Sequence, residues 1–474
     1  MTPVIAIAGA TGFVGRALCR DLARDHRVIA LSRTAAEIEG VETRACDLFV
    51  LGQVEAALSG ADVAIYLVHS MLPSARLTQA SFADLDLLLA DDFARAAERA
   101  GVKRILYVGG LVPEDGPLSP HLASRKEVEE TLGSRGAALA ALRCGIIVGP
   151  GSSSLWILVN LVRRLPAMIL PRWTESSSQP IALADLVGAV RIVLEEPERF
   201  TGAFDLGGPG RMSYREMLAR TAGVLGRRRW LLGVPLFTSR LSRLWVSIFG
   251  SAPLALVTPL VESLRHEMRV APNPLQDRIA PAAKGFETAL ADALDARGRP
   301  LPPPSSIRLG APARRLLHQA RSVRSVQRLP LPPGRDARWA AEEYLRFLPR
   351  FMRPWIRVET DAAGGARFFF AGTRLCLLAL QLASGSERDR TELEIVGGTM
   401  LARADGPRGR FELRQVLGDT ALLAAIHDYR PALPWRLYQL TQARVHLAVM
   451  RGFARHLARL AAEPGRGDTQ HEAR

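Results

Sequence analysis

The chain has 474 residues, 48% of them hydrophobic and 23% charged, a balance that excludes a disordered protein and is typical of two or three folded domains. The net charge of +15 is unevenly distributed, because residues 1–150 carry 15 basic and 18 acidic side chains and the basic excess lies in the C-terminal two-thirds. No nucleic-acid-binding motif accompanies these arginines, so we expect no nucleic-acid partner.

Short apolar runs alternate with helical patterns in the first 150 residues. This alternation predicts a Rossmann-type, doubly wound parallel sheet in an α/β domain. The predicted strands are 4–8, 27–31, 63–68, 104–108 and 140–148, and the predicted helices are 15–25, 54–58, 85–100 and 121–132.

The rest of the chain predicts two further regions. Residues 151–295 continue the NAD(P)-binding domain (1–295) as a substrate or lid segment, in which Ser213 caps a helix. A Pro- and Arg-rich linker is expected over 296–337, because dense proline disfavours packed helix or sheet. A C-terminal α+β domain is predicted over 338–463 and a disordered tail over 464–474.

The C-terminal domain shows a series of strands followed by one long amphipathic helix, 434–460. A curved sheet gripping a helix, the helix-grip arrangement, would fit this order and often encloses an apolar cavity. The predicted strands are 355–359, 366–370, 375–382, 392–395 and 411–417.

Three glycines, Gly9, Gly12 and Gly15, follow the first predicted strand and open the first helix. The first permits a tight turn, the second lets the backbone approach a pyrophosphate, and the third lets the helix pack on the sheet. The phosphate would then lie on the free N–H groups at the helix N-terminus. The spacing therefore predicts a dinucleotide site.

The residues after the second strand indicate which dinucleotide binds. An acidic residue there would accept from the ribose 2′-hydroxyl, whereas this chain has Ser32 and Arg33, and Arg33 can pair with a 2′-phosphate. NADP(H) is therefore favoured over NAD(H). Asp47 is expected either to accept from the adenine amino group or to cap a helix. The predicted cofactor-binding residues are Gly9, Thr11, Gly12, Phe13, Val14, Gly15, Ser32, Arg33, Asp47, Leu48 and Val68.

Several segments together resemble the atypical short-chain dehydrogenase/reductase superfamily, in its NmrA-like branch near the complex I accessory-subunit type. The resemblance rests on GATGFVG at 9–15, CDL at 46–48, YLVHS at 66–70 and LRCGIIVGPG at 142–151, and PRW at 171–173 and QPIA at 179–182 extend it to about residue 280. The C-terminal part resembles a poorly characterised domain fused to such proteins in some bacteria.

The resemblance implies a Ser and a Tyr-x-x-x-Lys pair, and this chain has neither at the expected places. Gly109 and Gly110 stand where the Ser belongs, and His121 and Arg125 occupy the Tyr and Lys positions. His121 could donate a proton, because histidine titrates near neutral pH, and Arg125 lies one helical turn away on the same face. His69, at the end of a strand, would open onto the cofactor crevice. The alternative is a domain that binds the cofactor without turning it over, as a redox sensor or assembly factor.

Other features bear on partners and location. We expect a cytoplasmic protein, because Met1 leads into an apolar strand without a signal sequence. The uncharged segment 244–261 suggests either an apolar lid or peripheral membrane contact, and a hydrophobic or lipid-like ligand is expected. The arginines at 163–164, 172 and 227–229 are interpreted mainly as helix-end charges. No metal site is predicted, since the four cysteines are scattered, and His427, Asp428 and His446 are interpreted as structural.

Overall fold

The computed structural model describes residues 2–33, 38–69, 77–113, 116–234, 263, 265–301, 323–361, 364–402 and 408–462. The chain divides into two compact units. The first unit comprises residues 1–71 and 89–310, and the second comprises 72–88 and 311–474.

The first unit is built on a seven-stranded parallel sheet with the order β3-β2-β1-β4-β6-β7-β12. The chain reverses its direction of winding between β1 and β4, and in such sheets ligands bind at this switch point, outside the carboxyl ends of the strands. The strands are β1 (Ile5–Ala8), β2 (Val28–Ser32), β3 (Glu42–Ala45), β4 (Val63–Tyr66), β6 (Arg104–Gly110), β7 (Ala138–Cys144) and β12 (Gly202–Leu206).

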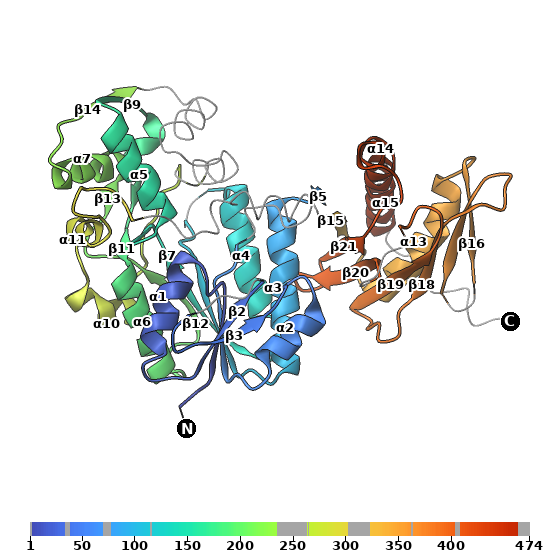
Figure 1. Cartoon of the computed structure of the whole chain (residues 1–474), viewed down its shortest axis with the longest axis horizontal. Coiled ribbons are helices and arrows are strands. Elements are labelled where there is room, and N and C mark those ends of the chain that lie inside the picture. The colour runs from blue at the N-terminus through green and yellow to red at the C-terminus, as the bar shows by residue number, and fades with distance from the viewer. Residues whose placement is uncertain are drawn as a thin grey trace. The chain divides into compact units, whose positions relative to one another are not determined.

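Helices cover both faces of this sheet, as Figure 1 shows. Two separate apolar clusters result, because the side chains of each strand alternate between the two faces. One face carries α1 (Phe13–Leu22), α6 (Leu183–Glu195) and α10 (Pro274–Ile279), and the other carries α2 (Leu51–Leu58), α3 (Phe82–Arg99) and α4 (Pro120–Leu132). The predicted doubly wound Rossmann sheet is confirmed.

Residues 147–300 add small sheets and helices around their own apolar cluster. Ser213 caps α7 with a full capping box, in which its hydroxyl accepts from Glu216 N–H and the Glu216 carboxylate accepts from Ser213 N–H. The two-stranded pairs are β8 (Ile147–Val148) with β11 (Ile181–Ala182), β10 (Ser177–Ser178) with β13 (Met212–Ser213), and β9 (Ala167–Pro171) with β14 (Trp230–Val234). The helices are α5 (Ser153–Arg164), η1 (Arg172–Glu175), α7 (Tyr214–Val224), η2 (Ala280–Ala282) and α11 (Phe286–Ala291).

The second unit is an eight-stranded, mostly antiparallel sheet with helices packed against it. Its order is β16-β17-β18-β19-β20-β21-β15-β5, and only the β15–β5 pair is parallel. The strands are β5 (Leu77–Gln79), β15 (Val323–Pro330), β16 (Ile356–Thr360), β17 (Ala366–Phe370), β18 (Cys376–Leu382), β19 (Arg390–Gly397), β20 (Arg410–Val416) and β21 (Ala421–Tyr429). The helices are α13 (Ala337–Phe351), α14 (Trp435–Leu440) and α15 (Gln442–Ala462).

The structure corrects three expectations about this unit. Strand β15 lies inside the region predicted to be a linker, because the prolines gather at the end of the strand rather than within it. The single helix expected over 434–460 is two helices, separated at Thr441. Strand β21 and helix α13 were not predicted at all. The observed architecture of the second unit is a mixed sheet with packed helices. The segment 244–261, predicted to be a lid or a membrane contact, lies outside the described residues.

Candidate functional site

The glycine loop joins β1 to α1 with a geometry that only glycine permits. Gly9 has φ +85°, and its carbonyl accepts from the N–H of Gly12 at 2.9 Å. A Cβ on Gly15 would lie 2.3 Å from the Gly9 carbonyl oxygen. Gly12 then precedes α1 without a side-chain cap, and the first turn of the helix carries no acidic residue. The N–H groups at this helix end are therefore suited to a phosphate.

The other predicted loop residues have modest local roles. The Thr11 carbonyl accepts from Arg16 Nε at 2.9 Å, and Val14 packs against the apolar cluster beneath α1. Phe13, between them, is half-buried and begins the helix.

The residues expected to select the dinucleotide lie at the ends of β2, β3 and β4. Ser32 is the buried last residue of β2, and Arg33 follows it, exposed to solvent. The Asp47 carboxylate accepts from Phe49 N–H at 3.2 Å in a short turn before α2. Asp47 is therefore not a helix cap, since Val50 holds that position. Half-buried Leu48 and Val68 pack against the apolar cluster on the α2–α4 face.

His69 and His121 come together although 52 positions separate them in the sequence. Their ring centroids lie 5.0 Å apart, with His69 following β4 and His121 in the first turn of α4. Ser119 fixes the start of α4 by accepting from Leu122 N–H at 3.3 Å. Two side chains able to exchange protons thus share the carboxyl edge of the sheet, next to the switch point.

Arg125, one turn after His121, is held against β6. Its Nη2 donates to the Val108 carbonyl at 2.9 Å, and its guanidinium lies 5.3 Å from the centre of the Tyr107 ring. The Tyr107 hydroxyl donates to the Arg125 carbonyl at 3.2 Å. Arg125 Nη1 is buried and makes no hydrogen bond among the residues described here. A half-buried arginine whose Nη1 is buried and unused, at the cofactor edge, fits an oxygen-rich ligand.

The place of the missing Ser is filled by an aromatic ring. A Cβ on Gly109 would lie 2.7 Å from Cε1 of Tyr107, so no larger residue fits there unless the tyrosine moves. Sequence reasoning recorded Gly109 but missed Tyr107. The spacing of two residues along one strand, which puts both on the same face, is the signal that could have found it.

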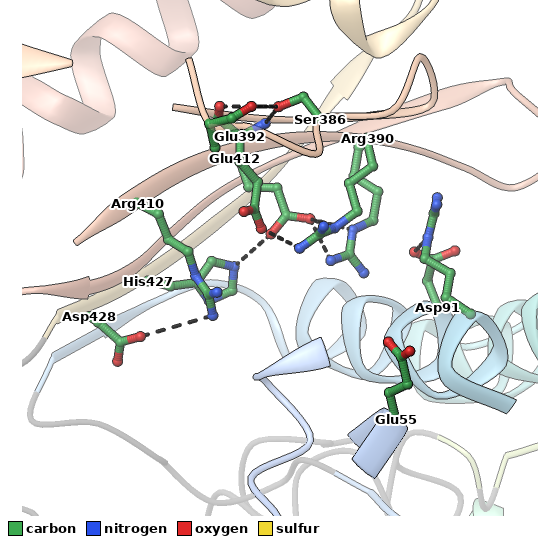
Figure 2. Close-up of polar contacts among 12 residues, drawn as sticks. Glu55, Asp91, Ser386, Arg390, Glu392, Arg410, Glu412, His427 and Asp428 are labelled. Carbon is green, nitrogen blue, oxygen red and sulfur yellow. Dashed lines mark hydrogen bonds and ion pairs between the residues drawn. The ribbon is translucent and has the colours of Figure 1, made fainter. Parts of the chain in front are cut away.

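His427, in strand β21 of the second unit, has a different charged neighbour from the one that its sequence suggests. His427 Nε2 lies 3.4 Å from a carboxylate oxygen of Glu412, whereas Asp428 lies 3.9 Å from Arg410 (Figure 2). His427 is therefore placed next to Glu412 and Asp428 next to Arg410, and the structural role of the two residues stays a prediction.

Glu412 is the centre of a charge cluster that sequence reasoning missed. It pairs with Arg390 at 2.9 Å and with Arg414, and both arginines are buried. Burial by itself raises the pKa of Glu412, but Arg414, the hydrogen bond from His427 and Arg390 together hold that pKa well below its usual range. Within the described residues no group of three or more side chains has the arrangement of a metal site.

The fold and the glycine loop together define a dinucleotide-binding protein of the Rossmann type. A family model described as NAD(P)H-binding matches residues 9–144. The chain is 30% identical over 246 residues to a ceramide reductase of Caulobacter vibrioides, a match that spans 49% of this chain and 74% of the reductase. It is 35% identical over 114 residues to the auxiliary protein GraX of Staphylococcus aureus, spanning 23% of this chain but only 37% of GraX.

Two solved structures are similar at lower identity. Triphenylmethane reductase of Citrobacter, complexed with NADP(H), is 17% identical with a TM-score of 0.48, covering 61% of this chain and 100% of that one. An NADPH-dependent quinone oxidoreductase of Escherichia coli, complexed with NADPH, is 18% identical with a TM-score of 0.48, covering 60% and 98%. The chain belongs to the NAD(P)H-binding, NmrA-like branch of the atypical short-chain dehydrogenases/reductases and carries an additional C-terminal unit with a mostly antiparallel sheet.

Proposed function

We propose that this chain is an NADP(H)-dependent reductase of an apolar or amphiphilic carbonyl or enone compound. The observation that carries the proposal is the meeting of His69 and His121, at 5.0 Å between ring centroids, on the sheet edge that the glycine loop shares. The ceramide reductase similarity supports a lipid-like substrate.

The residues present fit a dinucleotide. The N–H groups before and within the first turn of α1 would hold the pyrophosphate, and Gly15 keeps the helix close to the loop. Arg33 would pair with the 2′-phosphate beside Ser32, and Asp47 would accept from the adenine amino group. When bound, NADPH supplies a hydride.

His121 is the proton donor in this proposal. It would donate a proton to the substrate oxygen, which becomes the hydroxyl of the product, and His69 would orient its ring from the facing position. Arg125 would hold the ribose with its buried Nη1, because Nη2 is already engaged by Val108.

The proton-donor role is tested with purified protein, NADPH and a panel of long-chain ketones and enones. We expect His121→Ala to lower turnover on the order of 100-fold or more while NADPH binding is retained. His26→Ala, four residues beyond the end of α1, is the matched control and should leave turnover unchanged. Unchanged turnover in His121→Ala would remove the proton-donor role.

The choice of dinucleotide is tested separately. Arg33→Ala should weaken NADPH binding about tenfold and leave NADH binding unchanged, because only NADPH carries the 2′-phosphate. Equal losses for both dinucleotides would mean that Arg33 does not read this group.

A second candidate, a non-catalytic redox sensor or assembly factor, is favoured by one observation. The position of the family's Ser is closed by Tyr107, which lies 2.7 Å from where a Cβ on Gly109 would be. A protein of this kind would bind NADPH and NADP⁺ with different affinities in a thermal-shift panel and reduce none of the carbonyl compounds.

The second unit is proposed to bind an apolar ligand in a helix-grip manner. In support, α13 and α15 share one apolar cluster with the inner faces of β17 to β21. A fluorescent fatty acid should bind this chain with saturation, and absence of saturable binding would remove the ligand role.

A further inference from the structure

The paired strands β9 and β14 present an apolar face to solvent. Their parallel register aligns Trp230 with Ala167 and Leu232 with Ile169. Trp230, Ile169 and Leu232 are 73%, 64% and 55% exposed. The alternate residues Met168 and Leu170 are buried against α5 and α7, so the ladder is packed on one side only. In Figure 1 these strands lie at the upper margin of the first unit.

Arginines surround this face, and acidic residues are absent from the two segments that form it. Residues 161–172 and 223–234 contain no aspartate or glutamate and six arginines, namely Arg163, Arg164, Arg172, Arg227, Arg228 and Arg229. Hydrogen bonds join the two segments, since Arg227 Nη1 donates to the Arg163 carbonyl at 3.1 Å and Arg229 Nε donates to the Val162 carbonyl at 2.5 Å. Five of the six arginines are thereby gathered at the end of α5, beside Trp230, and Arg172 lies at the other end of β9.

We propose that this surface, defined by Ile169, Trp230, Leu232 and the six arginines, docks on an anionic lipid bilayer. Tryptophan favours the headgroup region, leucine and isoleucine enter the acyl boundary, and arginines attract anionic headgroups. An exposed apolar centre with arginines in excess around it fits this occupant, and the nearby Glu175 is already paired with Arg215 at 3.2 Å. A second copy docking through the same face would bring two arginine clusters together. A nucleic acid would leave the apolar centre without a partner.

The proposal goes beyond reduction and does not depend on it. The surface is defined by described residues, and the proposal makes no use of the segment 244–261. Within the described residues no helix is long and apolar enough to cross a bilayer. Contact through a β-ladder and its arginines is therefore a peripheral mode of binding.

The test is co-sedimentation of the full chain with vesicles of phosphatidylcholine alone or mixed with phosphatidylglycerol. We expect binding to the anionic vesicles only, weakening as salt rises. Trp230→Ala/Leu232→Ala and Arg227→Glu/Arg228→Glu should each lower the bound fraction at least tenfold. NADPH binding by both variants verifies that the first unit remains folded.

Two matched controls lie in the second unit. Trp355 is 70% exposed, so Trp355→Ala removes a comparable tryptophan, and Arg451→Glu/Arg455→Glu reverses two exposed arginines of α15. Both controls should bind like the native chain. Quenching of tryptophan fluorescence by brominated lipid should fall in Trp230→Phe but not in Trp355→Phe.

Three results would overturn the proposal. The first is a native chain that does not sediment with anionic vesicles, and the second is β9–β14 variants that bind as well as the native chain. The third is a lipid-free oligomer that the Trp230→Ala/Leu232→Ala change dissociates, which would assign this face to a second copy. A native chain that sediments with anionic vesicles but reduces none of the carbonyl compounds would overturn the proposed reaction and leave the membrane proposal in place.

Discussion

Charged side chains occupy different places on the strands of the two units. Strand β1, with the sequence IAIA, is buried at every position between two helical layers. Strand β20, with the sequence RFELRQV, alternates instead, so that Phe411 and Leu413 join the apolar cluster while Glu412 and Arg414 form ion pairs on the other face. In the first unit the candidate polar site lies at the ends of the strands, whereas in the second unit the charge lies along them.

Because of this contrast, we expect substitutions to act at different kinds of position in the two units. A close backbone approach at the strand ends fixes the cofactor loop of the first unit, and a buried charge network stabilises the sheet of the second. Changes at the loop should affect binding first, and changes in the network should affect stability first.

The largest effect on cofactor binding is expected at Gly15. Gly15→Ala places a Cβ 2.3 Å from the Gly9 carbonyl oxygen, so the loop must open and lose its fit to the pyrophosphate. NADPH affinity should fall on the order of 100-fold, or about 3 kcal/mol, in a fluorescence titration. Gly52→Ala in α2, where a Cβ meets nothing within 4 Å, is the control and should leave affinity unchanged. Native affinity in Gly15→Ala would contradict the role of the loop.

The largest effect on stability is expected at Glu412. Glu412→Gln leaves Arg390 and Arg414 without their shared carboxylate and should destabilise the second unit by about 3–5 kcal/mol in urea unfolding. Exposed Glu394→Gln, which removes a 3.4 Å pair with Arg408, should cost at most about 1 kcal/mol. Equal costs for the two variants would show that the cluster contributes no more than a surface pair.

The Glu412 pair also makes the second unit sensitive to acid. Because the folded-state pKa lies well below the usual 4.5, the stabilisation is present above pH 4.5 and is lost as the pH falls through the lowered pKa. Glu412→Gln should lack this part of the acid transition.

His446 in α15 gives a third, smaller effect on stability. It arises from burial of a neutral imidazole, whereas the effect at Glu412 arises from charged partners. Burial lowers the pKa of His446 from 6.5 to about 4, since the imidazole is held neutral. The second unit should keep its full stability above pH 6.5 and lose up to about 3 kcal/mol as the pH falls from 6.5 to 4. His446→Leu should flatten this slope in unfolding measurements across pH, whereas His456→Gln on the same helix should retain it.

The smallest effect is expected at Ser213. Ser213→Ala removes the hydrogen bond that the Ser213 hydroxyl accepts from Glu216 N–H and keeps the one that Ser213 N–H donates to the Glu216 carboxylate. The loss should cost about 1 kcal/mol in unfolding of the first unit. Ser213→Thr keeps the hydroxyl and should cost less. A threonine variant no more stable than the alanine variant would contradict the cap.

Many of the strands and helices could be predicted from the local sequence pattern. Strand β17 was predicted at its observed bounds, Ala366–Phe370, and the helix cap at Ser213 was predicted correctly. Strand β21 was missed because its run ALLAAI lacks the alternation of a half-buried strand. The strand is central in the sheet, paired with β15 and β20, and its residues 421–425 are all buried. Strand β15 was missed because the prolines at and after its end suggested a linker, although residues 323–329 contain no proline.

The candidate site was readable only in part. His69 was chosen from its place at a strand end, and His121 because it occupies the position of the family's Tyr. Their approach to 5.0 Å depends on β4 and β6 pairing side by side, with α4 following β6. No local pattern reports which strands become neighbours.

The sequence by itself determined the dinucleotide loop, because the steric demands on Gly9, Gly12 and Gly15 are met within seven residues. Only the tertiary structure decided that Tyr107 fills the place of the missing Ser, and that Glu412 rather than Asp428 faces His427. The reason is physical: a turn is specified by neighbours along the chain, whereas ring packing and ion pairing are specified by strands that meet through long-range pairing.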